Sequence, residues 1–243
     1  MAVVLGTLYD LCSLICLQGL TLMAVYSKNC PEFVVAEQAC FAAGGATVPL
    51  YDTLGPETVS FVLAQTGASV VVCFGDKEVE ACLSVAQQCP QLKLVVAIDP
   101  SVKARPATKG PNGAVTTPEV VGFGHLEAEG FGLRHRAKHT PPAPHDVATF
   151  CYTSGTTGDP KGALITHANL VAAVANLECS DIDDFTAEDV HLSYLPLPHI
   201  FERVVQLNVF AFGAAVGFSS GDPLKLVKWR VLKVYSCLLL FFS

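Results

Sequence analysis

The chain has 243 residues, of which 51% are hydrophobic and 15% charged, and its formal net charge is −7. This negative charge argues against a nucleic-acid-binding protein, because such proteins usually present a basic stripe. A chain of this length buries roughly 70–75% of its unfolded surface. A charged fraction below the usual quarter therefore indicates a heavily buried fold, or an apolar surface that meets a partner, a lipid or a further domain.

The first 27 residues contain no Lys or Arg and one acid, Asp10. A signal peptide would need a basic N-terminal region. A membrane-spanning helix would bear a cost of about 2.5–3.5 kcal/mol for Asp10 near its centre. We therefore expect a core helix over Leu8–Leu17 and a buried strand over Leu20–Tyr26, with a membrane-spanning segment as the alternative.

Short apolar runs alternate with helix-like segments through the first hundred residues. Pro31 and Pro56 suit the first turns of two helices, and Gly44-Gly45 and Gly67 suit their ends. A third helix follows the apolar spacing of Val79–Ala86. Strands without polar alternation, separated by amphipathic helices, predict an α/β fold whose parallel sheet is covered on both faces. The further strands expected in this region are Thr47–Tyr51, Val70–Phe74 and Leu92–Ile98.

Between Asp99 and Asp146 the composition shifts to Pro, Gly, Lys and Ala, which predicts a surface connection with a short helix around Glu119–Glu129. Beyond the connection, Thr166 or Asn169 can cap a helix. The segments expected after it are a solvated acidic stretch over Asp181–Asp189, a strand over Val190–Tyr194, a helix through Phe201–Leu207 and a strand over Ala214–Phe218.

The ten cysteines are scattered along the chain, without a C-x-x-C pair. We expect buried free thiols, since cysteine packs as a small hydrophobe and disulfides are rare in reducing compartments. The cysteine spacings do not suit a zinc site. The expected localisation is intracellular, either cytoplasmic or on an organelle membrane that faces a reducing compartment.

A loop rich in Gly, Ser and Thr, residues 152–162, lies between two short apolar runs. Its glycines let backbone N–H groups approach phosphate oxygens, its hydroxyls add neutral donors, and Lys161 adds a positive charge. A Walker A loop would need Gly-Lys-Ser/Thr followed by a helix, whereas Pro160 precedes Lys161 and a strand-like run follows Gly162. The alternative is a solvated hairpin turn, although such turns need only about two to five residues. The candidate phosphate ligands are Thr153, Ser154, Gly155, Thr156, Thr157, Gly158 and Lys161.

A second constellation, Pro196-x-Pro198-His199-x-Phe201-Glu202-Arg203, follows the strand expected over Val190–Tyr194. The two prolines end that strand, so His199 lies at a strand's carboxyl end, where α/β sheets bind their ligands. Taken alone, His199 is better explained as a helix cap, and Glu202 and Arg203 as exposed helix charges. The phosphate loop favours a catalytic interpretation of His199.

Residues 153–162 resemble the phosphate-binding signature of the adenylate-forming (AMP-binding) enzyme superfamily. Residues 194–203 resemble the histidine-containing motif of its long-chain acyl-CoA synthetases, or long-chain fatty acid–CoA ligases. Residues 25–40 and 48–55 are similar to the same family, so that the resemblance covers roughly residues 24–226 in order. The fold that it implies is the N-terminal domain of the adenylate-forming fold, with largely parallel sheets and a β-hairpin phosphate loop.

The resemblance also implies a reaction in which ATP and Mg²⁺ activate a long-chain fatty acid to an acyl-adenylate, after which coenzyme A attacks to give acyl-CoA and AMP. Thr153–Gly158 would hold the β- and γ-phosphates with Lys161 beside them. His199 would line the adenylate and acyl side of the pocket as the catalytic residue. Fatty acid, ATP and coenzyme A are the expected partners, peripheral membrane association is a further expectation, and nucleic acid is not expected.

The chain lacks several segments that the family's pattern contains. It contains no Tyr-Gly-x-Thr-Glu-like segment, and the family's ribose-binding aspartate, hinge and C-terminal lysine are missing. We expect a partial AMP-binding domain over residues 1–230, including the Pro/Gly-rich connection 99–146, then a divergent apolar tail over 231–243 and no C-terminal domain. The alternatives are an inactive nucleotide-binding or interaction fragment, or another adenylate-forming ligase.

Overall fold

The structure is a computed structural model of the chain, in which residues 22–111, 113, 115–131, 141–153, 160–178 and 186–218 are described. The chain divides into two compact units, residues 1–167 (unit 1) and residues 168–243 (unit 2). The expected helix Leu8–Leu17 and the expected tail 231–243 lie outside the described residues.

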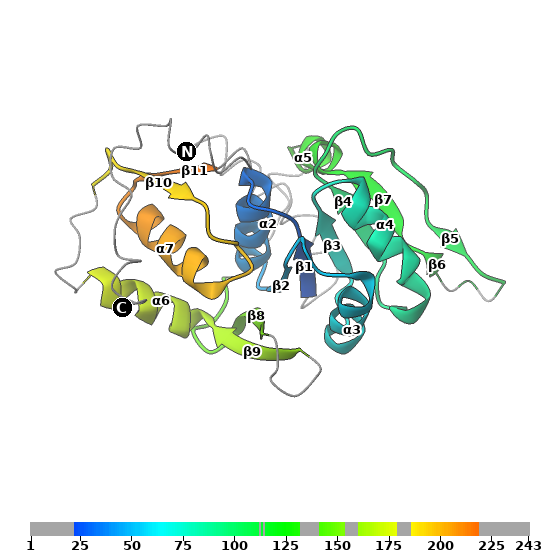
Figure 1. The fold of residues 1–243 in the computed structure, drawn as a ribbon, viewed down its shortest axis with the longest axis horizontal. Coiled ribbons are helices and arrows are strands. Elements are labelled where there is room, and N and C mark those ends of the chain that lie inside the picture. The colour runs from blue at the N-terminus through cyan, green and yellow to red at the C-terminus, as the bar shows by residue number, and fades with distance from the viewer. Residues whose placement is uncertain are drawn as a thin grey trace. The chain divides into compact units, whose positions relative to one another are not determined.

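Unit 1 is built on a seven-stranded sheet with the strand order β7-β4-β3-β1-β2-β8-β9 (Figure 1). All neighbouring strands are parallel except β8 and β9, which form an antiparallel hairpin. This confirms the expected α/β fold with a hairpin at the Gly-rich loop. The strands are β1 (Leu22–Tyr26), β2 (Ala46–Leu50), β3 (Val70–Cys73), β4 (Leu94–Ala97), β7 (Glu119–Gly122), β8 (Val147–Thr153) and β9 (Lys161–Thr166).

Three helices connect the first four strands: α2 (Pro31–Ala42), α3 (Pro56–Thr66) and α4 (Asp76–Ser84). Both expected helix starts are confirmed, because Pro31 and Pro56 occupy the first helical positions. The expected end of α3 is also confirmed. Gly67 closes this helix with a φ of 68°, a left-handed conformation that glycine adopts without steric cost.

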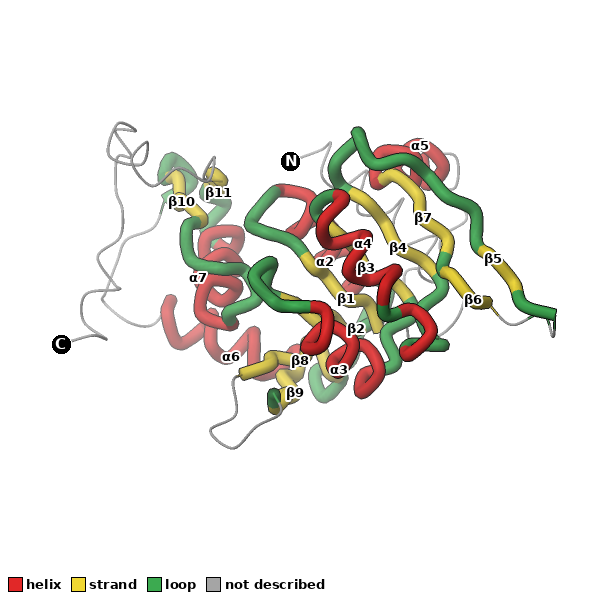
Figure 2. The backbone as a smooth tube through the Cα atoms, turned by 45° about the vertical axis from the view of Figure 1, so that its right-hand side comes forward, coloured by secondary structure: helices red, strands yellow, loops and turns green. Residues whose placement is uncertain are grey.

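Helices cover both faces of the parallel strands (Figure 2). The step from β1 to β2 crosses the sheet in one direction, and the steps to β3 and β4 cross it in the other. Right-handed crossovers therefore put α2 on one face, and α3 and α4 on the opposite face. The strand residues agree: Ala24 and Tyr26 belong to the apolar cluster of α3 and α4. Met23 and Val25 are equally buried and alternate with them toward the α2 face.

The region between Asp99 and Asp146 contains more regular structure than we expected. Helix α5 (Phe123–Phe131) lies where a short helix was predicted, but it is preceded by β7, which extends the parallel sheet beyond β4. Val120 of β7 is buried in the apolar cluster. A short antiparallel pair, β5 (Thr108–Lys109) and β6 (Val115–Thr117), lies before β7, and a 3₁₀ turn, Ala86–Gln88, precedes β4.

Unit 2 contains a parallel strand pair, β10 (Val190–Ser193) and β11 (Ala215–Phe218), connected by helix α7 (Ile200–Ala211). Both strands and the helix lie where the sequence predicted them. Helix α6 (His167–Glu178) precedes them and begins directly after Thr166, one of the two predicted caps. The part of the expected acidic stretch over residues 181–185 lies outside the described residues.

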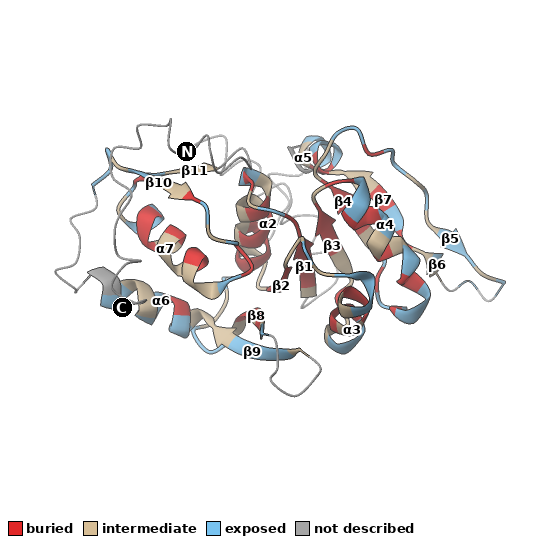
Figure 3. Ribbon diagram, viewed as in Figure 1, coloured by how far each residue is buried: buried red, intermediate tan, exposed pale blue. Residues whose placement is uncertain are grey.

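Burial falls steeply across the sheet of unit 1 (Figure 3). All five residues of β2 are buried, whereas four of the six residues of the edge strand β9 are exposed. Leu164 of β9 is 58% exposed. Strand β9 therefore buries less of its surface than the strands at the centre of the sheet, whereas its partner β8 keeps Ala148, Thr149 and Cys151 buried.

Six cysteines within the described ranges are free and buried, as expected: Cys30, Cys40, Cys73, Cys82, Cys89 and Cys151. The Sγ atoms of Cys73 and Cys82 lie 3.7 Å apart. Burial raises the pKa of Cys73 well above its usual value, which disfavours the reactive thiolate. In the part of the chain that the structure describes, no helix is long and apolar enough to cross a membrane.

Candidate functional site

The β8–β9 hairpin presents the two ends of the predicted phosphate loop. Thr153 and Lys161 face each other as the last pair of the antiparallel ladder. Both residues are exposed, so their hydroxyl and ammonium groups are accessible to an anion. The other predicted ligands, Ser154, Gly155, Thr156, Thr157 and Gly158, lie outside the described residues.

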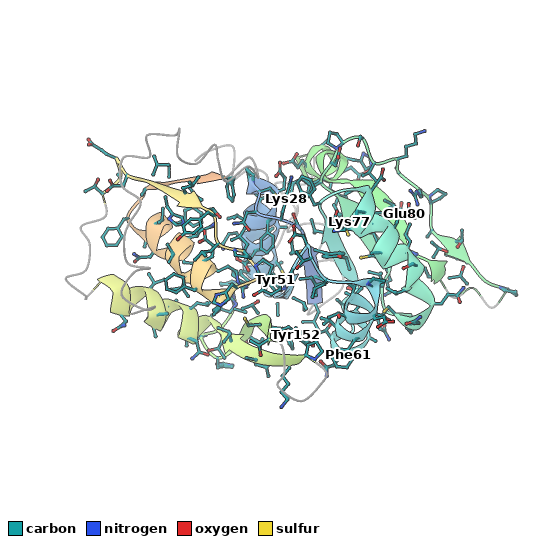
Figure 4. The ribbon with its side chains drawn as sticks, viewed as in Figure 1. Lys28, Tyr51, Phe61, Lys77, Glu80 and Tyr152 are labelled. Carbon is teal, nitrogen blue, oxygen red and sulfur yellow. The ribbon has the colours of Figure 1, made fainter. Side chains whose placement is uncertain are left out.

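The loop begins at the carboxyl edge of the parallel sheet. Strand β8 runs parallel to β2, with Thr149 opposite Thr47, so Thr153 lies at the edge where β1 to β4 also end. Figure 4 labels Lys28, Tyr51 and Lys77, which follow the carboxyl ends of β1, β2 and β3. Ligands of open α/β sheets bind at this edge. The topology therefore puts the start of the predicted phosphate loop at the edge of the sheet where ligands of such folds bind.

Two lysines at this edge are held by local contacts. Nζ of Lys28 lies 4.1 Å from the ring centroid of Phe74, within the range of a cation–π interaction. Nζ of Lys77 donates a 2.9 Å hydrogen bond to the Asp52 carbonyl. The first contact joins the loops that follow β1 and β3, and the second joins the first turn of α4 to the loop that follows β2.

Thr47 and Thr149 join the hairpin to the sheet through a buried group of hydroxyls. The Thr149 hydroxyl donates to the Thr47 carbonyl at 3.1 Å. The Thr47 Oγ1 atom lies 3.0 Å from Thr149 Oγ1 and 3.3 Å from Glu37 Oε1, and its single proton serves one of these acceptors at a time. Glu37 of α2 is only 4% exposed, so this contact helps to satisfy a buried carboxyl group.

Tyr152 is a residue of the hairpin with no predicted role. Its hydroxyl donates a 2.6 Å hydrogen bond to Gln65 Oε1 on α3. Burial raises the pKa of Tyr152, which keeps this hydroxyl protonated as a donor. The ring lies against Gly162, its partner across the ladder. An aromatic residue opposite a glycine in an antiparallel pair is a packing signal that the sequence already contained.

His199 caps helix α7 in unit 2. Its Nδ1 atom accepts a 3.2 Å hydrogen bond from the Phe201 backbone N–H. A neutral imidazole that accepts through Nδ1 carries its proton on Nε2, so the exposed ring presents a donor on that side. The helix-capping interpretation is confirmed. A role of His199 in catalysis remains a prediction.

Glu202 and Arg203 are buried, at 1% and 3% exposure, so interpreting them as exposed helix charges was wrong. Glu202 Oε1 accepts hydrogen bonds of 3.0 Å from both His191 Nε2 and Gln206 Nε2. Gln206 Nε2 also donates to Ser193 Oγ at 2.8 Å. These contacts form because positions 202 and 206, one helical turn apart, lie on the side of α7 that packs on β10.

The donor set at the described loop ends suits a phosphate group better than a metal ion. Thr153 supplies a hydroxyl and Lys161 an ammonium group, whereas Mg²⁺ is bound through carboxylates, phosphates and water. Within the described ranges, no group of three or more His, Cys, Asp or Glu side chains could hold a metal ion. The described residues therefore assign no ligand to the Mg²⁺ that the family resemblance implies.

Comparison with known proteins agrees with this geometry. A family model described as AMP-binding enzyme matches residues 18–242. The chain is 40% identical over 205 residues to Long chain acyl-CoA synthetase 6, peroxisomal, of Arabidopsis thaliana, covering 84% of this chain and 28% of that protein. It is 37% identical over 211 residues to Long-chain-fatty-acid–CoA ligase 1 of Homo sapiens, covering 82% and 28%. The chain thus spans 28% of the length of these relatives.

Two solved structures show the same fold at lower sequence identity. Apo MatB from Rhodopseudomonas palustris superposes with a TM-score of 0.71 at 22% identity, covering 93% of this chain and 41% of that one. The adenylation domain of a carboxylate reductase from Mycobacterium chelonae superposes with a TM-score of 0.74 at 18% identity, covering 92% and 36%. At these identities the likeness supports the architecture alone.

Proposed function

Because the chain belongs to the AMP-binding enzyme family, we propose that it is part of a long-chain fatty acid–CoA ligase and supplies the site for the phosphates of ATP. The observation that carries this proposal is the β8–β9 hairpin. It presents Thr153 and Lys161 at the carboxyl edge of the sheet, on the two ends of a loop rich in hydroxyls and glycines. The long-chain ligases among the relatives support the choice of a fatty acid as substrate.

In the proposed reaction the fatty acid carboxylate attacks the α-phosphorus of ATP, and the bond to pyrophosphate breaks. The loop holds the β- and γ-phosphates, and Lys161 offsets the negative charge that accumulates on the leaving pyrophosphate. Coenzyme A then displaces AMP from the acyl-adenylate. Mg²⁺, when bound with the nucleotide, would neutralise further phosphate charge.

His199 has a proposed role on the acyl and adenylate side of the site. With Nδ1 engaged by the Phe201 N–H, its Nε2–H is available to donate a hydrogen bond to an oxygen of the adenylate. The six buried free thiols support an intracellular reducing compartment as the location. Association with a membrane surface stays part of the proposal.

The proposal is tested with purified residues 1–243. Isothermal titration with ATP and Mg²⁺ measures nucleotide binding, and a parallel assay with palmitate and coenzyme A measures palmitoyl-CoA and AMP. Binding of ATP together with product formation supports the ligase. Binding without product agrees with a chain that supplies the phosphate site as one part of a ligase, and also with the alternative, an inactive nucleotide-binding fragment; the Lys161→Ala variant in an active full-length ligase then separates these two. An absence of ATP binding would contradict both.

A further inference from the structure

Tyr152, labelled in Figure 4, contacts two elements of unit 1 besides its own strand. It belongs to β8, its hydroxyl donates to Gln65 of α3, and its ring covers Gly162 of β9. Tyr152 directly precedes Thr153, and Gly162 directly follows Lys161. The contacts of this one side chain therefore reach both ends of the proposed phosphate loop and join them to a helix.

The space over Gly162 is filled by the tyrosine ring. A Cβ atom at position 162 would lie 3.0 Å from Tyr152 Cζ, 3.2 Å from Cε2 and 3.3 Å from Cε1. The ring cannot move aside without cost, because its hydroxyl is bonded to Gln65 at 2.6 Å. Glycine at position 162 thus permits the ring to bridge the hairpin and helix α3.

Tyr152 and the ends of the loop lie beyond the residue pair that records the backbone pairing between the hairpin and the rest of the sheet. Over the described length of β2 and β8, the register between them consists of Thr47 opposite Thr149. The chain then continues for four residues to Thr153, paired with the exposed strand β9. Tyr152 contacts α3 within that extension, next to the loop.

We infer that Tyr152 is a positioning residue for nucleotide binding: its hydroxyl bond to Gln65 and its ring contact with Gly162 hold the ends of the phosphate loop in place relative to α3. This inference rests on the proposed function of the loop. It adds a role for Tyr152, Gln65 and Gly162 in aligning Thr153 and Lys161, without direct contact between Tyr152 and the nucleotide.

The test uses two variants that remove the hydrogen bond from either side, Tyr152→Phe and Gln65→Leu, together with their double variant. Tyr26→Phe is the matched control. The Tyr26 hydroxyl donates an equally short 2.6 Å bond, to the Leu54 carbonyl, and does not belong to the hairpin. Each variant is made in the full 243-residue chain, and its melting temperature shows how far the substitution acts on stability alone.

The first readout is hydrogen exchange of the backbone amides in residues 150–166, which needs no ligand. We expect Tyr152→Phe and Gln65→Leu to raise exchange near Thr153 and Lys161 by about 2- to 10-fold, the range for one lost hydrogen bond. The double variant should exchange no faster than the worse single variant, since both remove the same bond. Tyr26→Phe should leave exchange in the hairpin unchanged.

The second readout is the Kd for ATP, which should increase about 2- to 10-fold in Tyr152→Phe and in Gln65→Leu and stay unchanged in Tyr26→Phe. Unchanged exchange in the hairpin would overturn the inference, whatever the Kd. A weaker Kd with unchanged exchange would mean that Tyr152 contacts the nucleotide directly. If the wild-type chain binds no ATP, the proposed function fails, and the exchange data still decide whether Tyr152 holds the loop.

Discussion

In unit 1, helices α3 and α4 meet the sheet through apolar side chains, whereas in unit 2 helix α7 meets β10 through hydrogen-bonded polar side chains. Val62 and Leu63 of α3 are fully buried in the apolar cluster. Glu202 and Gln206 of α7 are equally buried, but they are bonded to each other and to His191 and Ser193. Apolar packing is non-directional, whereas a buried polar group requires each partner to be present. The two units should therefore respond differently to substitution.

The largest expected effect comes from the buried carboxyl group of unit 2. Glu202→Ala leaves His191 Nε2 without its acceptor and Gln206 Nε2 without one of its two, and each buried donor left unsatisfied should cost about 1–3 kcal/mol. Leu63→Met, a volume-conserving change in the apolar cluster of unit 1, should cost less than about 1.5 kcal/mol. Urea unfolding followed by circular dichroism measures both.

Glu188→Ala is the matched control, because Glu188 is exposed in the same unit and its loss should change stability by less than about 0.5 kcal/mol. If Glu202→Ala and Glu188→Ala were equally mild, Glu202 would behave as the exposed charge that the sequence suggested. The contrast between the two units would then disappear.

The second prediction concerns crowding at the hairpin of unit 1. Gly162→Ala places a Cβ atom 3.0 Å from the Tyr152 ring, and overpacking of this kind commonly costs about 1–3 kcal/mol. The combined variant Gly162→Ala, Tyr152→Ala should cost less than the sum of its two single substitutions, since removing the ring relieves the clash. The free energy of unfolding of all three variants checks this. Additive losses would show that the ring and Gly162 are independent.

The elements that could be predicted are those whose structure is determined by residues within the same segment. Uninterrupted apolar runs such as Val70–Cys73 predicted the central strands, because a parallel sheet buries both of its faces. Pro56 and Gly67 bound α3 through their own backbone preferences. The fold class and the ends of the phosphate hairpin followed from such signals.

The elements that could not be predicted depend on partners distant in sequence. Strand β7 has four residues after Pro118, and it forms because β4 offers it an unpaired edge. The burial of Glu202 depends on His191, a residue of another element. The hydrogen bond between Tyr152 and Gln65 joins residues 87 positions apart. None of these partners can be identified from the periodicity of a single segment.

The third prediction separates the two roles of His199. His199→Ala removes the Nδ1 acceptor and should destabilise the start of α7 by about 0.5–2 kcal/mol. His199→Asn restores a capping oxygen but has no Nε2–H, so it should recover stability without recovering a catalytic contact. Unfolding measurements combined with adenylation kinetics in an active full-length ligase distinguish the two roles. Full activity of the Asn variant would leave His199 as a helix cap alone.

The smallest expected effect is the pH dependence contributed by His167 in unit 1. Its ring packs edge-on against Phe41, with centroids 5.1 Å apart. Burial lowers the pKa of His167 below its usual 6.5, an effect that Asp146 partly opposes. The unfolded chain therefore binds a proton more readily than the folded chain, so stability is fully present above about pH 6.5 and declines as the pH falls below it.

Melting temperatures between about pH 8 and pH 5 measure this dependence. His167→Gln should flatten the decline, whereas His145→Gln, at a side chain that is 86% exposed, should retain it. A decline of the same size in both variants would assign the pH dependence to other groups.

The most direct test of the central claim, that the β8–β9 hairpin binds the phosphates of ATP, is the Kd for ATP of the Lys161→Ala variant. Losing a charge-assisted contact should weaken binding by about 1.5–3 kcal/mol, which is more than tenfold. Lys109→Ala, which removes the same charge from the exposed β5, should bind ATP as the wild type does. Equal affinities of the Lys161→Ala and Lys109→Ala variants would contradict the assignment of the phosphate site.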